Sequence, residues 1–218
     1  LLARDLSGQI GSMLRPVGKQ WFNVRTPFEK WNNDRRIREA LDWRSEQMMR
    51  IMYDRVTGFT RAAKHTDEFF AVFGNAVLHC DLSMEQDSLR YGAHHIKDCV
   101  WALGPDGLPN KIQRKERISL RNLRARFGEK AIKGQLKELI EKDDDHEVGI
   151  RHDVIPADEY DFYKKGLKRK AGQFASVWTC ESEGGHVIRE ATQPTFRYII
   201  PRWTHQRNSP YALSLASV

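Results

Sequence analysis

The distribution of apolar residues changes from a helical to a strand-like pattern near residue 75. Before that point, apolar residues recur every three or four positions in the ranges 1–14, 33–54 and 59–73. This spacing predicts three amphipathic helices. The third ends at Gly74, which suits a helix C-terminus, and its predicted apolar side consists of Phe59, Ala63, Thr66, Phe70 and Phe73.

Two further features belong to this helical part, residues 1–75. Trp21, Phe22 and Val24 favour a pleated, half-buried surface, so a short strand is predicted at residues 21–27. The methionines of the second helix lie among other apolar residues, and we interpret them as core filler.

Residues 76–206 are predicted to be mainly strands. Hairpins are indicated by a turn at residues 105–107 and another at 184–185, with further strands at 76–82, 147–155 and 196–203. Two short helices are inserted near residues 119–142, the first capped by Ser119. Strands and helices do not alternate regularly, which favours an α+β fold with antiparallel pairing.

The last predicted element begins at Ser209-Pro210. Serine is a common helix N-cap and proline is common at the first helical position, so a helix is predicted to begin within residues 207–218. The pattern therefore divides the chain into a helical part (1–75), a β-rich part (76–206) and the start of a further helix (207–218).

Composition describes a polar, globular chain. Hydrophobic residues make up 40% and charged residues 30% of the 218 positions. No apolar run is long enough to predict a membrane-spanning helix. The first residues do not resemble a signal peptide, because Asp5 interrupts them and no basic leader precedes them. We expect the chain, which begins without methionine, to be part of a longer one. Cys80, Cys99 and Cys180 are widely spaced, so free thiols are expected.

The net charge of +7 is concentrated in two segments. Residues 111–126 hold seven basic residues and one acid, and residues 164–170 hold five basic residues and no acid. The remaining 24 basic and 28 acidic residues give a net charge of −4. Such local basicity suits a polyanion or an acidic protein surface, although a solvated face is an equal alternative. The candidate contact residues of the first segment are Arg114, Lys115, Arg117, Arg121 and Arg124.

No residue pattern predicts a catalytic or cofactor site. His95 and Cys99 would share one side of a strand, but no second cluster supplies further metal ligands, so ordinary packing is favoured. The acidic run before Glu147 resembles a magnesium nuclease site only weakly, because consecutive aspartates cannot all face one ion. His152-Asp153 has no accompanying nucleophile motif, and phosphate-binding glycine loops are absent. We therefore predict a chain without enzymatic activity, metal or cofactor.

Several segments, in order, resemble the head-to-tail connector (portal) proteins of short-tailed bacteriophages. GQIGSMLRPVGKQWFNVR resembles the opening helix, proline and Trp-Phe segment of that family, and EFFAVFGNAVL resembles its helix ending in Phe-Gly. The match continues through LRYGAHHIKDCVWALGPDGLPNKIQRKERISLRNLRARFGE, HEVGIRHDVIPADEYD, FASVWTCESEGGHVIREA, FRYIIPRW and SPYALSLASV. The chain departs from the family pattern at residues 204–208, where the family has a longer connection.

The resemblance implies a structural subunit. Portal proteins form a ring, usually of twelve subunits, at one capsid vertex, and duplex DNA passes through it during packaging and ejection. The implied partners are further copies of the chain, the major capsid protein, tail adaptor proteins, the terminase and non-specifically bound DNA, with no membrane. The implied location is the virion, after assembly in the host cytoplasm. The residues present resemble the wing region, ending where the stem helix begins.

Because the wing of such a ring faces outward for much of its surface, we favour protein contacts over DNA contacts for the five basic residues. Two alternatives from other classes stay open at this point. One is a magnesium-dependent nuclease using residues 143–147, and the other is a simple nucleic-acid-binding module using residues 111–126.

Overall fold

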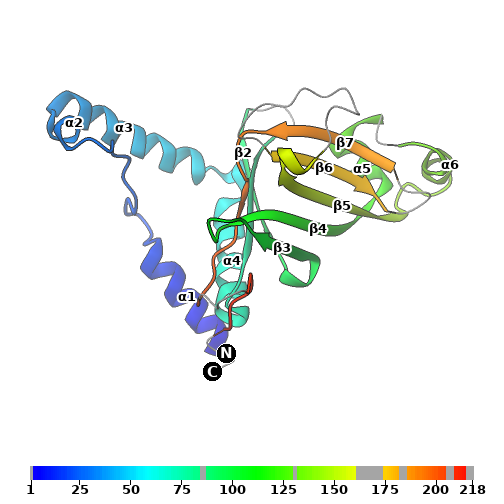
Figure 1. Cartoon of the computed structure of the whole chain (residues 1–218), viewed down its shortest axis with the longest axis horizontal. Coiled ribbons are helices and arrows are strands. Elements are labelled where there is room, and N and C mark those ends of the chain that lie inside the picture. Colours follow the sequence, from blue (N-terminus) through cyan, green and yellow to red (C-terminus); the bar gives the residue numbers. More distant parts are fainter. Residues whose placement is uncertain are drawn as a thin grey trace. The chain divides into compact units, whose positions relative to one another are not determined.

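The computed structural model describes residues 2–83, 87–129, 132–160, 174–181, 186–204 and 209–214. Helices and two antiparallel sheets make up an α+β fold, as the sequence predicted (Figure 1). The chain divides into two compact units. Unit 1 comprises residues 1–94, 198–207 and 211–218, and unit 2 comprises residues 95–197 and 208–210. The sequence division at residue 75 marks the change from helices to strands, whereas unit 1 also includes the next two strands because they pack against its last helix.

The helices of unit 1 follow the predicted order. They are α1 (Leu2–Leu14), α2 (Glu29–Asn33), α3 (Arg35–Met52), the short 3-10 helix η1 (Arg55–Thr57) and α4 (Phe59–Phe73). Asp34 caps α3 by accepting hydrogen bonds from the backbone N–H groups of Arg36 and Ile37. Gly74 ends α4 in the left-handed conformation, with φ of 67°. The three predicted helices are therefore confirmed.

The buried side of α4 differs from the predicted side. Phe59 and Ala63 are buried as expected, but Ala62, Asp67 and Ala71 complete the buried side, while Thr66, Phe70 and Phe73 are only partly covered. The reason is that α1 packs closely on α4. An added Cβ on Gly11 of α1 would lie 2.9 Å from the Asp67 carboxylate, so a larger residue at position 11 would require the Asp67 side chain to shift.

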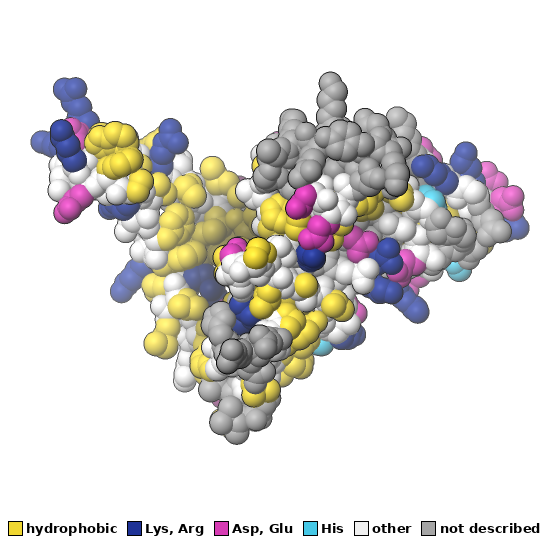
Figure 2. Space-filling view, viewed as in Figure 1, with side chains coloured by type: hydrophobic (Ala, Val, Ile, Leu, Met, Phe, Trp, Pro, Cys, Tyr) yellow, Lys and Arg dark blue, Asp and Glu magenta, His cyan; other side chains and the backbone are white. Residues whose placement is uncertain are grey.

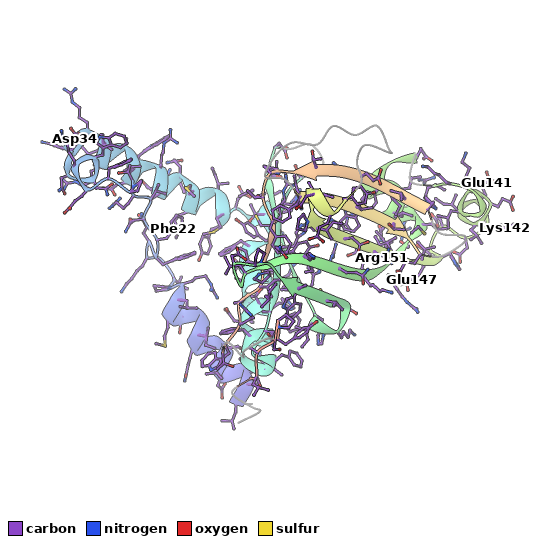
Figure 3. All side chains as sticks on the ribbon, viewed as in Figure 1. Phe22, Asp34, Glu141, Lys142, Glu147 and Arg151 are labelled. Atoms are coloured by element: carbon purple, nitrogen blue, oxygen red, sulfur yellow. The ribbon has the colours of Figure 1, made fainter. Side chains whose placement is uncertain are left out.

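The strand predicted at residues 21–27 does not form. This segment is irregular and contains Phe22 between α1 and α2 (Figure 3). Its backbone donors bond to side chains instead of a neighbouring strand. The Val24 N–H donates to Ser45 Oγ over 2.8 Å, and the Thr26 N–H donates to Asn32 Oδ1 over 2.9 Å. Side-chain acceptors on α2 and α3 thus bond to two backbone N–H groups that could otherwise pair with a neighbouring strand.

Unit 1 also contains a three-stranded antiparallel sheet in the order β2-β1-β8. Its strands are β1 (Val77–Leu82), β2 (Leu89–His94) and β8 (Tyr198–Ile199). The predicted final strand is therefore shorter than expected. It continues only as an isolated bridge between Asn75 and Arg202.

The helix predicted to begin at Ser209-Pro210 is not present among the described residues 209–214. Backbone groups of this segment bond to unit 1 instead. Asn75 Nδ2 donates to the carbonyl of Ala212, and the Ala212 N–H donates to Asn75 Oδ1, each over 2.8 Å. Gly74 lies so close to the segment that an added Cβ would be 2.3 Å from the Leu213 carbonyl oxygen. These contacts hold residues 212–213 against the end of α4 in a non-helical conformation.

Unit 2 is a five-stranded antiparallel sheet in the order β3-β4-β5-β6-β7 (Figure 1). The strands are β3 (Cys99–Leu103), β4 (Pro109–Ser119), β5 (Glu147–Pro156), β6 (Phe174–Cys180) and β7 (His186–Gln193), and short 3-10 helices occur at η2 (Ile96–Asp98) and η4 (Ala157–Glu159). The predicted β3–β4 hairpin is confirmed, with Gly107 at φ of 75° in its turn. The β6–β7 hairpin is also confirmed, although its predicted turn lies outside the described residues.

The two inserted helices of unit 2 are α5 (Leu120–Phe127) and α6 (Gln135–Lys142). Ser119 caps α5, as predicted, by accepting a hydrogen bond from the Asn122 N–H. The hydrophobic core of unit 2 lies between these helices and the sheet, and its buried members are Leu120, Leu123, Ile132, Leu136, Val148, Ile150, Trp178 and Cys180. The predicted apolar side of the second helix is confirmed, because Leu139 and Ile140 pack against this core.

Candidate interaction surfaces

The predicted basic residues of β4 lie on opposite sides of the sheet because strand side chains alternate. Arg114 points inward and its residue is only 3% exposed. Lys115 and Arg117 are exposed on the other side. Arg114 therefore cannot serve as a surface contact, whereas Lys115 and Arg117 can.

Arg114 belongs to a buried cluster of charged and aromatic side chains. Its Nη1 donates to Glu116 Oε2 over 2.5 Å, and Arg126 of α5 donates to the other oxygen of the same carboxylate. Both guanidinium groups lie near the ring of Trp178, with Cζ 5.2 Å and 4.5 Å from the ring centroid for Arg114 and Arg126. Loss of one partner from the cluster would be costly, because it would leave a buried charge unpaired.

His152 completes this cluster. Its ring stacks on Trp178 with centroids 3.9 Å apart and an interplanar angle of 5°. Its Nε2 lies 2.8 Å from Ser176 Oγ. Asp153 is on the opposite side of β5, where it accepts hydrogen bonds from Gln113 and Arg151. The adjacent pair in the sequence is therefore separated by the sheet.

The outward side of the same strands carries mixed charge. Glu181 forms ion pairs with Lys115 and with Arg151, each over 3.1 Å. Arg151 and Glu147 both extend from β5 on this part of the molecule (Figure 3). Arg117 is opposite Gly149 on the neighbouring strand, which has no side chain to cover it. Arg117 is thus open to contacts with a partner.

The remaining two predicted residues, on α5, form exposed ion pairs. Arg121 Nη2 lies 2.8 Å from Asp145, and Arg124 Nε lies 3.6 Å from Glu129. Exposed pairs of this kind contribute little stability, about 0–1 kcal/mol, so a partner can replace them at little cost. The structure therefore separates the five predicted residues into one internal residue and four surface residues.

The alternative metal sites are not assembled in the described part of the chain. His95 lies outside a strand, and its Nδ1 accepts a hydrogen bond from the Lys97 N–H to cap η2. Cys99 is buried, and burial raises its pKa to about 12. Asp145 is paired with Arg121. Among the described residues, no group of three or more His, Cys, Asp or Glu side chains is placed to hold a metal ion.

The helices of unit 1 expose large apolar side chains that sequence analysis did not identify as a surface. Trp43, Met48 and Ile51 of α3 are 61%, 51% and 54% exposed. Together with the exposed Ala40, we call these residues the α3 stripe. Phe28 and Trp31, whose ring centroids are 4.7 Å apart, are also exposed near α2. Figure 2 shows hydrophobic side chains along this part of the molecule.

The interpretation of the methionines as core filler was therefore wrong for Met48. Ile37, Leu41 and Ser45 form the covered side of α3. The irregular segment 21–26 runs beside it, with Val24 bonded to Ser45. A signal was present in the sequence, because Trp43 lies between Asp42 and Arg44 and outside the predicted apolar spacing. The segment 21–26 covers only a narrow strip of α3, so the apolar residues beside that strip remain exposed to solvent.

A second apolar surface of unit 1 is a groove between α1, α3 and α4, with a volume of about 1300 Å³. Its apolar wall positions include Gly8, Met49, Tyr53, Phe59 and Ala63. Charges within it are partly paired, because Arg15 bonds to Asp67 and Arg50 bonds to Glu46. Burial raises the pKa of the Asp67 carboxyl, and the Arg15 hydrogen bond opposes this effect. The groove, which Figure 2 shows between α1 and α3, is suited to an apolar occupant.

The described residues thus define an α+β protein whose notable surfaces are suited to contacts with other macromolecules. Its family is given by comparison with known proteins. The chain belongs to the bacteriophage head to tail connecting protein family, whose model matches residues 1–218. No curated protein matches the chain.

Membership of this family establishes a coarse function. The chain is a structural head-tail connector component of a phage virion, in a family that assembles with capsid and tail components. The resemblance found in the sequence is thereby confirmed at the level of the family. Within the part that the structure describes, no helix combines the length and the apolar character needed to cross a membrane.

Proposed function

We propose that the chain is the wing-containing part of a portal subunit of a short-tailed phage. Twelve such subunits form a ring at one capsid vertex, through which duplex DNA enters during packaging and leaves during ejection. The family match supports this proposal. The observation that carries it is the α3 stripe, because large apolar side chains in this number on one helix indicate a contact surface rather than a solvated face.

The proposed partners follow from a position between head and tail. The ring contacts the major capsid protein, the terminase binds during packaging, and tail adaptor proteins bind afterwards. Assembly takes place in the host cytoplasm. The role is mechanical and needs no catalytic residue or cofactor, and the charged residues near α6 are consistent with it because Arg121 and Asp145 pair with each other.

For the basic residues we propose contacts to acidic patches on neighbouring subunits, with DNA phosphate as the second candidate. Lys115, Arg117, Arg121 and Arg124 are exposed. A channel through which DNA slides needs weak, sequence-independent contacts, which scattered basic side chains provide. Arg114 is not part of this proposal because it is buried beside Glu116.

Electron microscopy of the longer parent subunit tests the proposed function. We expect closed rings with a central channel wide enough for duplex DNA. Separate monomers spaced along DNA would instead support a simple nucleic-acid-binding module. As a second assay, the subunit is incubated with duplex DNA and Mg²⁺. Cleavage that disappears when Asp144 and Asp145 are replaced by alanine would contradict the portal role.

A matched pair of variants tests whether ring formation depends on the α3 stripe. Ile51→Asp places a charge among its apolar residues, whereas Arg38→Asp changes an exposed residue on another side of the same helix. We expect Ile51→Asp to lower the fraction of ring particles at least tenfold, and Arg38→Asp to lower it less than twofold. Equal effects of the two variants would mean that the stripe is not a contact surface.

A further inference from the structure

The side of α3 that carries the α3 stripe also carries two arginines and no carboxylate. Successive residues of an α-helix are rotated by about 100° around its axis. Arg44 and Arg36, which are both exposed, therefore lie at about 20° and 60° from Ile51. The other residues of the stripe lie within about 80° of Ile51, namely Ala40, Met48 and Trp43.

The carboxylates of α3 lie on the other half of the helix. Counted in the same way, Glu39, Glu46 and Asp42 are about 120°, 140° and 180° from Ile51. All three form ion pairs with arginines, over 2.7 or 2.8 Å. Glu39 is the nearest of them to the stripe, because it precedes Trp43 by one turn, but its charge is paired. The acids of α3 are thus both distant from the centre of the stripe and already occupied.

Any surface that covers the stripe also covers two guanidinium groups without partners. Arg36 and Arg44 form no ion pair among the residues that the structure describes. Removing a charged group from water without giving it a partner is costly. A covering surface therefore needs carboxylates as well as apolar side chains. The two arginines are eight residues apart, which corresponds to about 12 Å along the helix, so the carboxylates should have a similar spacing.

An acidic protein surface fits these requirements better than DNA or lipid. Duplex DNA offers phosphates to the two arginines, but its backbone offers no apolar surface to Trp43 and Ile51. A bilayer of anionic lipid is a broad surface, so burial of Trp43 would also bring Glu39, one turn away, against negative charge. A protein surface can contact the narrower arc around Ile51 without reaching Glu39.

We propose that an apolar, acidic surface of the neighbouring subunit covers the α3 stripe, and that its carboxylates pair with Arg36 and Arg44. This inference rests on the proposed function, in which the stripe is needed for the ring. A second copy of the chain can supply the carboxylates. Glu138, Glu141 and Asp144 are exposed, and within the described part of the chain they form no ion pair.

Zero-length cross-linking of the assembled parent subunit tests this pairing. Arg44→Lys keeps the positive charge and introduces an amine, which a carbodiimide joins to a carboxylate in direct contact with it. Rings are assembled from equal amounts of isotope-labelled and unlabelled subunits, so that mass spectrometry recognises a peptide joined between two subunits. We expect mixed-label peptides that join position 44 to an aspartate or glutamate, whose identity locates the receiving surface.

A matched control makes the result specific to the stripe. Arg38 is also exposed on α3 but lies about 140° from Ile51. Arg38→Lys is expected to give less than a tenth of the mixed-label product, and equal yields from the two variants would overturn the inference. As a second measurement, Arg36→Glu combined with Arg44→Glu should lower the fraction of ring particles at least fivefold, and Arg38→Glu less than twofold.

Electron microscopy of the same samples distinguishes failure of the inference from failure of the proposed function. Rings without mixed-label peptides at position 44 would overturn the acidic contact and leave the portal role intact. Such peptides without closed rings would support the contact and contradict the ring. Neither result would contradict both.

Lipid binding is tested separately with vesicles of phosphatidylglycerol. Co-sedimentation of the parent subunit that Arg44→Glu abolishes would assign the stripe to lipid and overturn the inference.

Discussion

The two units of the molecule differ in how far they cover their apolar residues. In unit 2, α5 and α6 cover the sheet, and the core residues Leu120, Leu136 and Ile150 are fully buried. The buried Arg114 is paired there with Glu116, which also pairs with the partly exposed Arg126. In unit 1, α3 instead exposes Trp43 and Ile51 to solvent.

This difference indicates where a partner could cover apolar residues that the chain leaves exposed. In unit 2 the apolar residues between the sheet and the helices α5 and α6 are buried within the chain. The helix α3 is held by local features, namely its Asp34 cap and the ion pairs Arg35–Glu39 and Glu46–Arg50. Local features of this kind contribute tenths of a kcal/mol to about 1 kcal/mol each. The apolar residues of the α3 stripe can therefore be buried against a partner in an assembly.

The largest test of the comparison replaces one tryptophan in each unit. Trp178→Ala removes a buried ring that contacts His152, Phe127 and two guanidinium groups. We expect it to lower the free energy of unfolding by about 3–5 kcal/mol. Trp43→Ala removes an exposed ring and should change it by less than about 0.5 kcal/mol. Urea unfolding of the unassembled chain, followed by circular dichroism, measures both values, and equal losses would contradict the comparison.

A slightly smaller effect is expected from the charge cluster of unit 2. Glu116→Gln removes the carboxylate shared by two guanidinium groups, of which Arg114 is buried, and should cost about 3 kcal/mol of unfolding free energy. Glu181→Gln is the matched control, because it removes a carboxylate shared by Lys115 and Arg151 at the surface. It should cost less than about 1 kcal/mol. If the control variant proved as destabilising as Glu116→Gln, burial would not be what distinguishes the two clusters.

The Asn75 side chain offers a third test, within unit 1. Asn75→Ala removes both hydrogen bonds to the backbone of Ala212 and leaves buried groups without these partners, at a cost of about 1–3 kcal/mol. Hydrogen exchange followed by mass spectrometry should show faster exchange in peptides that contain Ala212. Peptides from β5 in unit 2 serve as the internal reference and should keep their protection.

The smallest effect concerns the thiols. Burial raises the pKa of Cys99 to about 12 from an ordinary value of 9.0, so at pH 8 only about one thiol in ten thousand is ionised. Iodoacetamide should modify the half-buried Cys80 first, as read by mass spectrometry of native protein. Because the folded-state pKa is the higher one, the contribution of Cys99 to stability is complete below pH 9 and is lost as the pH rises toward 12. Rapid modification of Cys99 at pH 8 would contradict its burial.

Much of the fold could be predicted because local signals agree with the final structure. Ser119 is both the predicted and the observed cap of α5, and Gly107 occupies the turn of the β3–β4 hairpin. The apolar spacing of α6 also indicated its buried side correctly. Each of these features depends on residues close together in the sequence, so a local pattern is sufficient to identify it.

The errors arise mainly where contacts between residues far apart in the sequence determine the local structure. The strand predicted at residues 21–27 is absent because Ser45 and Asn32 bond to its backbone. The helix predicted at Ser209-Pro210 is absent from residues 209–214, where Asn75 binds the segment in another conformation. Ser45 and Asn75 are far from these segments in the sequence, so a local pattern does not indicate their contacts.

The candidate surfaces show the same limit. The clustering of basic residues in the sequence identified both Arg114 and Arg117 as candidates. Only their positions on β4 show that Arg114 is buried and Arg117 is exposed. The pairing of Arg114 and Arg126 on Glu116 joins a strand to a helix. Helical spacing alone also could not show that Met48 and Ile51 lack a cover, because the segment beside α3 was predicted to be a strand.

The bond between Asn75 and Ala212 also has a consequence for synthesis of the chain on the ribosome. It joins residues 137 positions apart, and β1 pairs with β8 across a comparable interval. Unit 2 lies almost entirely within that interval and can fold as soon as residues 95–197 have emerged. The sheet of unit 1 has to wait with β1 and β2 already synthesised but β8 still missing. The sheet of unit 1 is therefore completed only after all the strands of unit 2 have been synthesised.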